Sequence, residues 1–512
     1  MRGAVVFLCL LATGAAAEGP RSVIPWLSES LLAPDAPDVA VPEPSASPSG
    51  GEIEMSPLGA PVRDGAGLLS PQATGFPPDL WQETSALRVR RLIAGHPGTG
   101  VPSTRELFHT VLIAEATPPP GAGSRLLLQR IDRLMADGRL EEAEALIETA
   151  GIADPEIFRR AFDIGLLTDR SERVCTALAE GPALSPTLPA RIFCLARAGD
   201  WAAAELTLSL GVEIGALTPP EEDMLARFLD PQLFEDVAPP PVPKPLTTLD
   251  FVLRDAIALP RPNGALPPAF LHIDLRQESP MRARILAAER LVRETAVPAQ
   301  VLLAAYRAGV PAASGGIWDR AAAIQRLDAA LETGSSGEMT AAVLEADTLF
   351  SSVGLRRLAA VATAPLIRRL DHDTLPTEAR KRSAELLLLA RDWVGAVRCL
   401  QGTNDTMDRF LSALAQPGTA FDETGALPPL KRAAARGLTR PDVPSLRGEE
   451  IAARLSGGAY GAALLETLAL LAPGTDIDPG DFETGLWLLR KAGLTDWARR
   501  IAVETLLLLP EA

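Results

Sequence analysis

The sequence is poor in the residues that build β-sheets. Aromatic residues make up 4% of its 512 residues, only 2 of them are tyrosines, and runs that alternate β-branched with polar residues are rare. A half-buried strand needs that alternation, whereas apolar residues here recur at helical spacing, for example at Leu126, Leu127, Ile131 and Leu134. Both observations predict an all-α fold.

Lysine is scarce as well. Almost all of the 49 basic residues are arginines, and the 65 acidic residues outnumber them, so that the net charge is −16. Proteins that bind nucleic acids generally present a basic stripe to the phosphate backbone, so we expect no nucleic-acid partner. The preference for Arg, Ala, Leu and Pro is typical of a high-GC Gram-negative bacterium, in which an exported chain would be periplasmic.

Long apolar runs are absent after the first residues. A membrane-spanning helix needs about 20 predominantly apolar residues, and no later stretch reaches that length without charges, which predicts no stable transmembrane span. At the start, Arg2 precedes an apolar run over 4–12 that ends in Ala15, Ala16 and Ala17. This is the layout of a signal peptide over residues 1–17, with cleavage near Ala17 and a periplasmic or secreted mature chain. A retained N-terminal anchor is the alternative.

Cysteine is limited to four residues, and Cys9 lies within the predicted signal peptide. None of the spacings is Cys-x-x-Cys, which argues against a thioredoxin-like redox site and a zinc site. Cys175 and Cys194 lie on successive predicted helices, so a disulfide between them would close one hairpin in an oxidising compartment. The alternative is that Cys175, Cys194 and Cys399 are three buried thiols.

Proline is abundant and divides the chain. Residues 18–79 contain many Pro, Ser, Gly and Asp but few large apolar residues, which predicts a disordered Pro-rich tether. A second Pro-rich segment over 231–249 cannot continue a helix, because Pro lacks the amide hydrogen. We therefore expect two helical hairpin blocks, over 80–230 and 250–512, which are either separate domains or one continuous superhelix.

A short pattern recurs within these blocks: a turn residue, a large apolar residue, and Ala three positions later. The large residue and the Ala are Leu140 and Ala143, Trp201 and Ala204, Met339 and Ala342, Trp393 and Ala396, and Tyr460 and Ala463. Gly ends the preceding helix, Asp200 or Asp392 accepts free amide hydrogens of the next one, the large residue wedges into the pair, and Ala lets the helices approach closely. A further copy at Trp497 has Arg500 in place of Ala.

This pattern resembles the tetratricopeptide-like repeat, whose second helix commonly begins with Gly, Asp or Asn, an aromatic residue and a later Ala. The resemblance implies an irregular α-solenoid of helical hairpins after residue 80, although the copies lack a constant 34-residue interval. A non-repetitive helical bundle is the alternative. The whole chain also resembles uncharacterised secreted proteins of alphaproteobacteria, some of which carry the label antifreeze glycopeptide polyprotein. It has no Ala-Ala-Thr array or Thr ladder that would suit ice binding.

One carboxylate is a candidate catalytic residue. Glu278 and Ser279 resemble the Glu-Ser of soluble lytic transglycosylases, periplasmic enzymes with an α-superhelical domain. The resemblance implies that Glu278 acts as general acid and base on peptidoglycan. The chain then departs from that family, because "PMRARILAAERLV" replaces its Gly-Leu-Met-Gln segment and its sugar-stacking aromatics. The departure favours a structural interpretation, in which Ser279 caps a helix that begins at Pro280.

Metal ligands and cofactor motifs are few. Of the four histidines, His372 has carboxylates on both sides, and Asp371, His372 and Asp373 are more typical of a solvated turn than of a cation site. No phosphate-binding, dinucleotide-binding or nucleophile-elbow motif has a strand-turn-helix context. We therefore expect no metal and no cofactor.

Together these patterns predict a non-enzymatic periplasmic scaffold or adaptor whose surface binds a protein or peptide partner in the cell envelope. The alternative is a divergent peptidoglycan-active enzyme, or a helper of one, related to soluble lytic transglycosylases. A third possibility is a binder of a small molecule or glycan in a groove between hairpins. The patterns make no prediction about the oligomeric state.

Overall fold

The structure of the chain is a computed structural model that describes residues 63–509 except 121–124, 153, 185–186, 403–404, 417, 419–420 and 422–426. The predicted signal peptide over 1–17, with its cleavage near Ala17, and residues 18–62 of the predicted tether lie outside the described residues.

The described residues form an all-α fold, as predicted. An isolated bridge between Leu69 and Ala114 is the only β-type pairing among them. None of the helices in this part of the chain is long and apolar enough to span a bilayer. The short 3₁₀ helices are η1 (Arg63–Gly65), η2 (Pro182–Leu184), η3 (Pro231–Phe234), η4 (Pro268–Leu275) and η6 (Gly474–Asp476). The α-helices are α2 (Pro71–Thr74), α3 (Ala86–Gly95), α4 (Pro102–Ile113), α5 (Arg125–Ala136), α6 (Leu140–Ala150), α7 (Pro155–Leu167), α8 (Ser171–Glu180), α9 (Leu188–Arg197), α10 (Trp201–Glu213), α11 (Pro219–Leu229), α12 (Thr248–Ala256), α13 (Met281–Arg293), α14 (Ala299–Arg307), α15 (Ile317–Thr333), α16 (Ser336–Ser351), α17 (Arg356–Ile367), α18 (Thr377–Leu389), α19 (Trp393–Cys399), α20 (Thr406–Ala415), α21 (Pro429–Thr439), α22 (Leu446–Ser456), α23 (Tyr460–Leu470), α24 (Pro479–Lys491) and α25 (Thr495–Leu507).

Seven of the described turns share one backbone geometry and start the next helix at the same point, and the same geometry recurs at Gly215, Ala258 and Thr295, where the next helix begins later. In each, one residue has a left-handed conformation, and the N–H of the next residue donates to the carbonyl five residues earlier at 2.8–3.0 Å. This Schellman arrangement satisfies a terminal carbonyl of the first helix while it reverses the chain. The left-handed residues of the seven turns are Gly138, Asp169, Gly199, Gly354, Arg391, Gly458 and Gly493.

At each of the seven turns, the second helix begins two residues after the left-handed residue, and its fourth residue is small and buried. That residue is Val174 in α8 and Ala in the six other helices. The six alanines, Ala143, Ala204, Ala359, Ala396, Ala463 and Ala498, are 0–2% exposed. Since a methyl group occupies so little space, the two helix axes can approach closely at this point. Four of them, Ala143, Ala204, Ala396 and Ala463, are positions of the pattern found in the sequence.

Two aspartates cap the second helices as the sequence suggests. The Asp200 side chain accepts the Ala203 amide at 3.1 Å, and the Asp392 side chain accepts the Gly395 amide at 3.0 Å. A side-chain oxygen at this position satisfies an amide that has no partner within its helix.

The large apolar residue does not wedge into every pair. Leu140 is buried, and Trp393 and Tyr460 are partly buried, but Trp201 is 51% exposed. Its ring centroid lies 6.4 Å from that of Phe228 on α11 and not between α9 and α10. The predicted wedge is therefore wrong at Trp201, because α10 already meets α9 through small residues and needs no large side chain there.

Two copies of the pattern have a different register from the predicted one. Helix α16 begins at Ser336, so Met339 and Ala342 lie one turn too far along it, and the neighbouring Schellman turn is the one at Gly354. Helix α25 begins at Thr495, so its small residue is Ala498 and not Arg500. The side-chain pattern predicted the wrong register for both copies, because the feature that the turns share is a backbone conformation.

Replacing Ala204 with Leu should lower the free energy of unfolding by about 1–3 kcal/mol, because a larger side chain has to be forced between α9 and α10. Ala202 on the same helix is exposed, so Ala202→Leu should change that free energy by no more than about 0.5 kcal/mol. Urea denaturation of both variants checks the difference. Equal losses would show that the small residue is not what sets the helix spacing.

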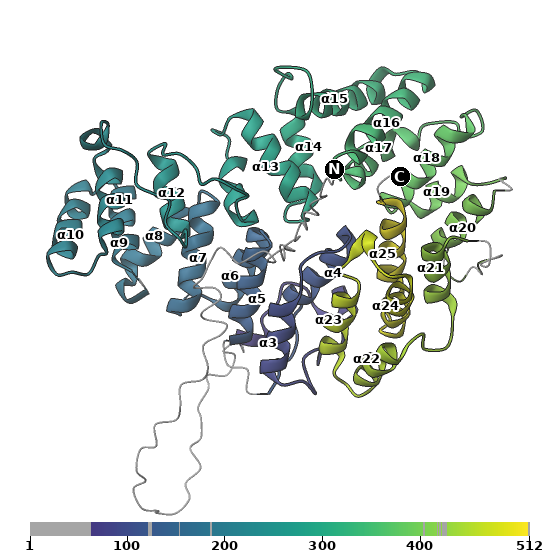
Figure 1. The fold of residues 1–512 in the computed structure, drawn as a ribbon, viewed down its shortest axis with the longest axis horizontal. Coiled ribbons are helices and arrows are strands. Elements are labelled where there is room, and N and C mark those ends of the chain that lie inside the picture. Colours follow the sequence, from purple (N-terminus) through teal and green to yellow (C-terminus); the bar gives the residue numbers. More distant parts are fainter. Residues whose placement is uncertain are drawn as a thin grey trace, which may run out of the picture.

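The helices pack in chain order, and the last ones return to the first. Helix α23 contacts α3 and α4, and α25 contacts α4, as Figure 1 shows for α4 and α25. At this junction the Gly461 amide donates to the Leu80 carbonyl at 2.8 Å, and the Ser103 amide donates to Glu504. Helices α7 to α12 project to the left in Figure 1; we call residues 155–256 the arm. The first and last helices of the arm meet at its base, because α12 packs on α7. The following η4 packs on α5 and α7.

The described residues form one packed unit rather than two blocks. Residues 63–79 belong to it, since the Asp64 side chain accepts the Leu127 amide at 2.8 Å and Phe76 is buried, so the folded part begins before residue 80. The segment 231–249 packs along the arm, where Arg227 and Arg254 donate to its carbonyl groups. A contiguous cluster of buried apolar side chains runs from Ala66 to Leu507. Proline therefore interrupts the helices without interrupting the core.

Cys175 of α8 and Cys194 of α9 form a disulfide bond, with their Cα atoms 5.1 Å apart, and Cys399 is a buried free thiol. The disulfide joins two successive hairpins of the arm and is not the closure of a single one. A Cys175→Ser, Cys194→Ser chain should lose about 2–3 kcal/mol of stability in the arm, since the bond restricts a short loop of the unfolded chain. Denaturation with and without reductant measures this. Reductant should weaken the wild-type chain and leave the double variant unchanged.

Candidate functional site

The candidate catalytic residue is exposed to solvent. Glu278 is exposed in the turn between η4 and α13. Ser279 donates to the Ile273 carbonyl at 3.2 Å, and Pro280, not Ser279, occupies the N-cap of a helix whose first residue is Met281. The predicted cap is therefore wrong by one residue. A general acid for glycoside hydrolysis needs an enclosed carboxyl group facing a second catalytic group, and the exposed position of Glu278 offers no such enclosure.

Three histidines have structural partners in the core. His272 contacts the Gly138 carbonyl at 2.7 Å, His109 contacts Asp137 at 3.0 Å, and the His96 ring stacks on Phe108 with centroids 3.9 Å apart. His372 lies beside the Cys399 thiol. Within the described part of the chain, no three His, Cys, Asp or Glu side chains meet in a group that could hold a metal ion.

An exposed apolar row lies on α10, near the end of the arm (Figure 1). Leu206, Leu210 and Ile214 follow one another at every fourth position, so they lie on one face of the helix. Their exposed fractions are 61%, 55% and 75%. The opposite face, with Ala204 and Leu208, is buried. A helix that is apolar on both faces is normally covered on both, which marks this row as a surface without a partner in the monomer.

Acidic residues flank this row along the chain. Residues 198–226 contain six acidic side chains and no basic one. Glu205 and Glu213, on α10 itself, are both exposed. The surface therefore combines an apolar stripe with a negative border.

The arm holds α10 through a chain of aromatic contacts. Ring centroids are 6.3 Å apart for Phe162 and Phe193, 5.8 Å for Phe193 and Phe228, and 6.4 Å for Phe228 and Trp201. The Cys175–Cys194 disulfide anchors α9, on which α10 packs, to α8. These contacts give the exposed row a well-ordered support.

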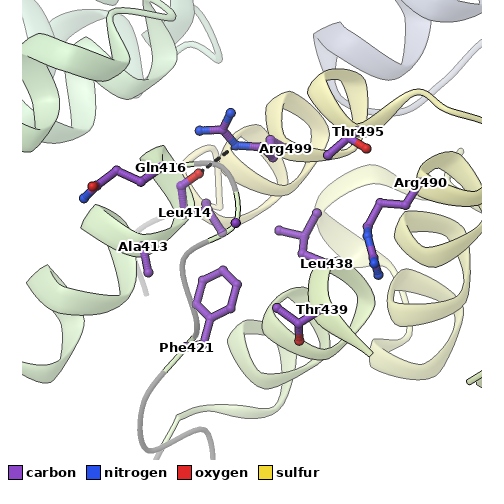
Figure 2. Close-up of a pocket in the computed structure, with 10 residues that line it drawn as sticks. Ala413, Leu414, Gln416, Phe421, Leu438, Thr439, Arg490, Thr495 and Arg499 are labelled. Atoms are coloured by element: carbon purple, nitrogen blue, oxygen red, sulfur yellow. Dashed lines mark hydrogen bonds between the residues drawn. The ribbon is translucent and has the colours of Figure 1, made fainter. Parts of the chain in front are cut away.

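Two cavities bordered by described residues are of ligand size. The smaller one, of about 500 Å³, is bordered by Phe421, Leu438, Arg490 and Arg499 (Figure 2). Its guanidinium groups already have protein partners. Arg499 donates to the carbonyls of Leu414 and Ala415, and Arg490 donates to the carbonyl of Gly437. Both guanidinium groups of this cavity are therefore already engaged by backbone carbonyls of the chain.

The larger cavity, of about 890 Å³, lies where the ends of α4, α13, α16 and α25 meet. Its lining includes four arginines, Arg105, Arg293, Arg356 and Arg382, and no acidic residue among those described. Sequence patterns did not single out any of these residues, because they are scattered over nearly 280 positions of the chain and only the fold brings them together.

No family model matches the chain, and neither a curated protein nor a solved structure matches it.

The sequence patterns did not single out the exposed row of α10 either. Its signal is present in the uncharged stretches between Trp201 and Leu217, which make α10 apolar on more than one face.

Proposed function

We propose that the chain is a non-enzymatic adaptor of the cell envelope, built as an irregular α-solenoid of tetratricopeptide-like hairpins, whose α10 surface binds a protein partner. The seven Schellman turns that are each followed by a buried small residue support the solenoid interpretation. The observation that carries the binding function is the exposed row of Leu206, Leu210 and Ile214. Burying that row against a partner removes apolar surface from water, which is the main favourable contribution to association.

The partner that fits this surface is an amphipathic helix with basic residues beside its apolar face. Its apolar residues, at three- and four-residue spacing, would lie along the α10 row and cover it from water. Its basic residues would face Glu205 and Glu213, which also disfavours acidic competitors. A complex of this kind weakens as the salt concentration rises, because its charged border is exposed.

The test is retention of envelope proteins on the immobilised chain. A Leu206→Ser, Leu210→Ser, Ile214→Ser variant should retain the partner at least about tenfold less than the wild type, because several central apolar contacts are lost together. Leu446→Ser is the matched control, since Leu446 is 79% exposed on α22, outside the arm. A protein that is retained equally by all three chains, at both low and high salt, would contradict the proposal.

We also propose that the chain acts in the periplasm or is secreted, after removal of residues 1–17. The Cys175–Cys194 bond supports this location, because disulfides persist in oxidising compartments. Cell fractionation tests it. The full chain should be recovered outside the cytoplasm with both cysteines resistant to alkylation, whereas a chain without residues 2–17 should remain in the cytoplasm with both reactive. Equal distribution of the two chains would contradict the proposed location.

If the chain is an adaptor, neither the wild-type chain nor the Glu278→Gln chain should cleave peptidoglycan. Incubation of purified peptidoglycan with the wild-type chain should release no soluble fragments above the level seen with Glu278→Gln. Fragments released by the wild type alone would favour the lytic transglycosylase alternative over the adaptor.

A further inference from the structure

The larger cavity is lined by positively charged side chains, although the chain as a whole is strongly acidic. Its four arginines come from α4, α13, α17 and α18, while the remaining lining is made of hydroxyl side chains, apolar side chains and turns. The volume of about 890 Å³ is within the usual range of small-molecule sites, roughly 300–1,000 Å³.

Two of the arginines are neutralised by acidic residues behind the cavity wall. Asp347 is fully buried and accepts Arg356 Nε at 2.8 Å and Arg382 Nη1 at 2.9 Å. Arg356 also pairs with Glu385 at 2.6 Å. These contacts hold both guanidinium groups in place and leave the wall near them close to neutral.

The other two arginines have no ion-pair partner among the described residues. Arg105 Nη1 donates to the Arg293 carbonyl at 2.9 Å, and Arg293 Nε donates to the Val353 carbonyl at 2.9 Å. Arg105 Nε is buried and meets no hydrogen-bond acceptor within the described structure. Burial lowers the pKa of Arg105, and the charges of Glu294 and Asp137 offset that effect only in part. Glu294, which is near enough to act on Arg105 through space, is instead paired with Arg290 at 3.0 Å.

Helix ends of both polarities border the cavity, because the C-terminal ends of α13, α16 and α25 line it beside the N-termini of α4 and α17. Val101 and Pro102 begin α4, Arg356 begins α17, and all three residues line the cavity. The partial charges of these helix ends oppose one another, and the Ser103 amide at the start of α4 already donates to Glu504, so the positive potential comes from the guanidinium groups. Hydroxyl groups of Thr475 and Ser352 supply further polar contacts in the lining.

We infer that this cavity binds a small polyanion, a molecule with at least two carboxylate or phosphate groups, through Arg105 and Arg293. The net charge of −16 repels anions from most of the surface, so an anion held here requires the local arrangement of guanidinium groups. The planar guanidinium suits both carboxylate and phosphate, because it can donate two parallel hydrogen bonds. This site lies apart from the α10 row, so each proposal can fail without the other.

Isothermal titration with citrate and with pyrophosphate tests the site and distinguishes the two anion types. At least one of them should bind saturably with a Kd of about 1 mM or tighter, at an ionic strength matched with sodium chloride. Preferential binding of citrate assigns a carboxylate ligand, and preferential binding of pyrophosphate assigns a phosphate ligand. Absence of saturable binding by both, up to about 10 mM, would overturn the inference.

The decisive variant is Arg293→Gln, since this side chain is exposed at the cavity and its loss leaves the core intact. It should weaken binding at least about tenfold, with an intermediate effect for Arg293→Lys, which keeps the charge but loses the planar donor. Arg447→Gln removes the same charge from an exposed site on α22 and should bind as the wild type does. Equal binding by Arg293→Gln and Arg447→Gln would overturn the assignment. Arg105→Gln should show the larger loss, and its circular dichroism spectrum checks that it folds.

Discussion

An Asp132→Asn chain is expected to lose about 3 kcal/mol of the free energy of unfolding, because the change removes the buried carboxylate that pairs with the Arg160 guanidinium and leaves it only the half-exposed Glu156 at 3.3 Å. Both side chains are 3% exposed, and Arg160 Nη2 lies 2.8 Å from Asp132 Oδ2. The pair connects α5 to α7, at the base of the arm. Asn has almost the same shape as Asp, so the loss measures the charge and not a cavity.

Urea denaturation measures the loss, and native-state amide exchange locates it, since protection should fall first in α5 and α7. The matched control is Glu148→Gln, which breaks the pair of Glu148 with Arg173. Those side chains are 47% and 57% exposed, so the control should cost no more than about 1 kcal/mol. Similar losses for the two variants would show that burial does not set the energy of the Asp132–Arg160 pair.

Acidification is expected to destabilise the wild-type chain by about 3 kcal/mol more than a His96→Asn chain, between about pH 7 and pH 4. Burial, and after it the charge of Arg133, lower the pKa of His96 from 6.5 to about 4. Between those two values the unfolded chain binds a proton that the folded chain excludes. The stability is therefore complete above about pH 6.5 and is lost as the pH falls toward 4.

The comparison between the two chains is needed because other groups titrate in the same range. Burial lowers the pKa of His109 and His272, which act in the same direction as His96. Burial raises the pKa of Asp163 to about 7, which acts in the opposite direction. Asn at position 96 can still accept the Gly98 amide that His96 Nδ1 accepts. If denaturation gives equal pH dependence for both chains, His96 is not excluded from protonation by the fold.

The repeated turns show how far sequence patterns predict the fold. Gly138, Gly199 and Gly458 identified hairpins correctly, because Gly adopts the left-handed conformation at little cost. Arg391 and Asp169 adopt the same conformation without being Gly, with φ values of 64° and 60°. The surrounding helices impose that backbone geometry at these two positions, so residue type alone identified only part of the set.

The candidate sites depend on information that is not local. Cys175 and Cys194 are 19 positions apart on neighbouring helices, so a bond between them could be proposed from the sequence. The exposure of α10 could not, since an apolar helix is buried or exposed according to which neighbours cover it. The arginine-lined cavity could not be proposed from the sequence either, because its lining residues range from Arg105 of α4 to Arg382 of α18.

The sequence by itself determined that the described chain is helical and that small residues allow paired helices to pack closely, because both properties follow from the spacing of side chains along one helix. Only the tertiary structure decided that the last helices pack against α4, that one face of α10 has no neighbour, and that four arginines share a cavity. The junction at α4 and the arginine cavity arise from contacts between residues hundreds of positions apart, and the open face of α10 arises because no distant helix covers it. Each such contact depends on the summed geometry of all the turns between its two partners, which no local pattern records.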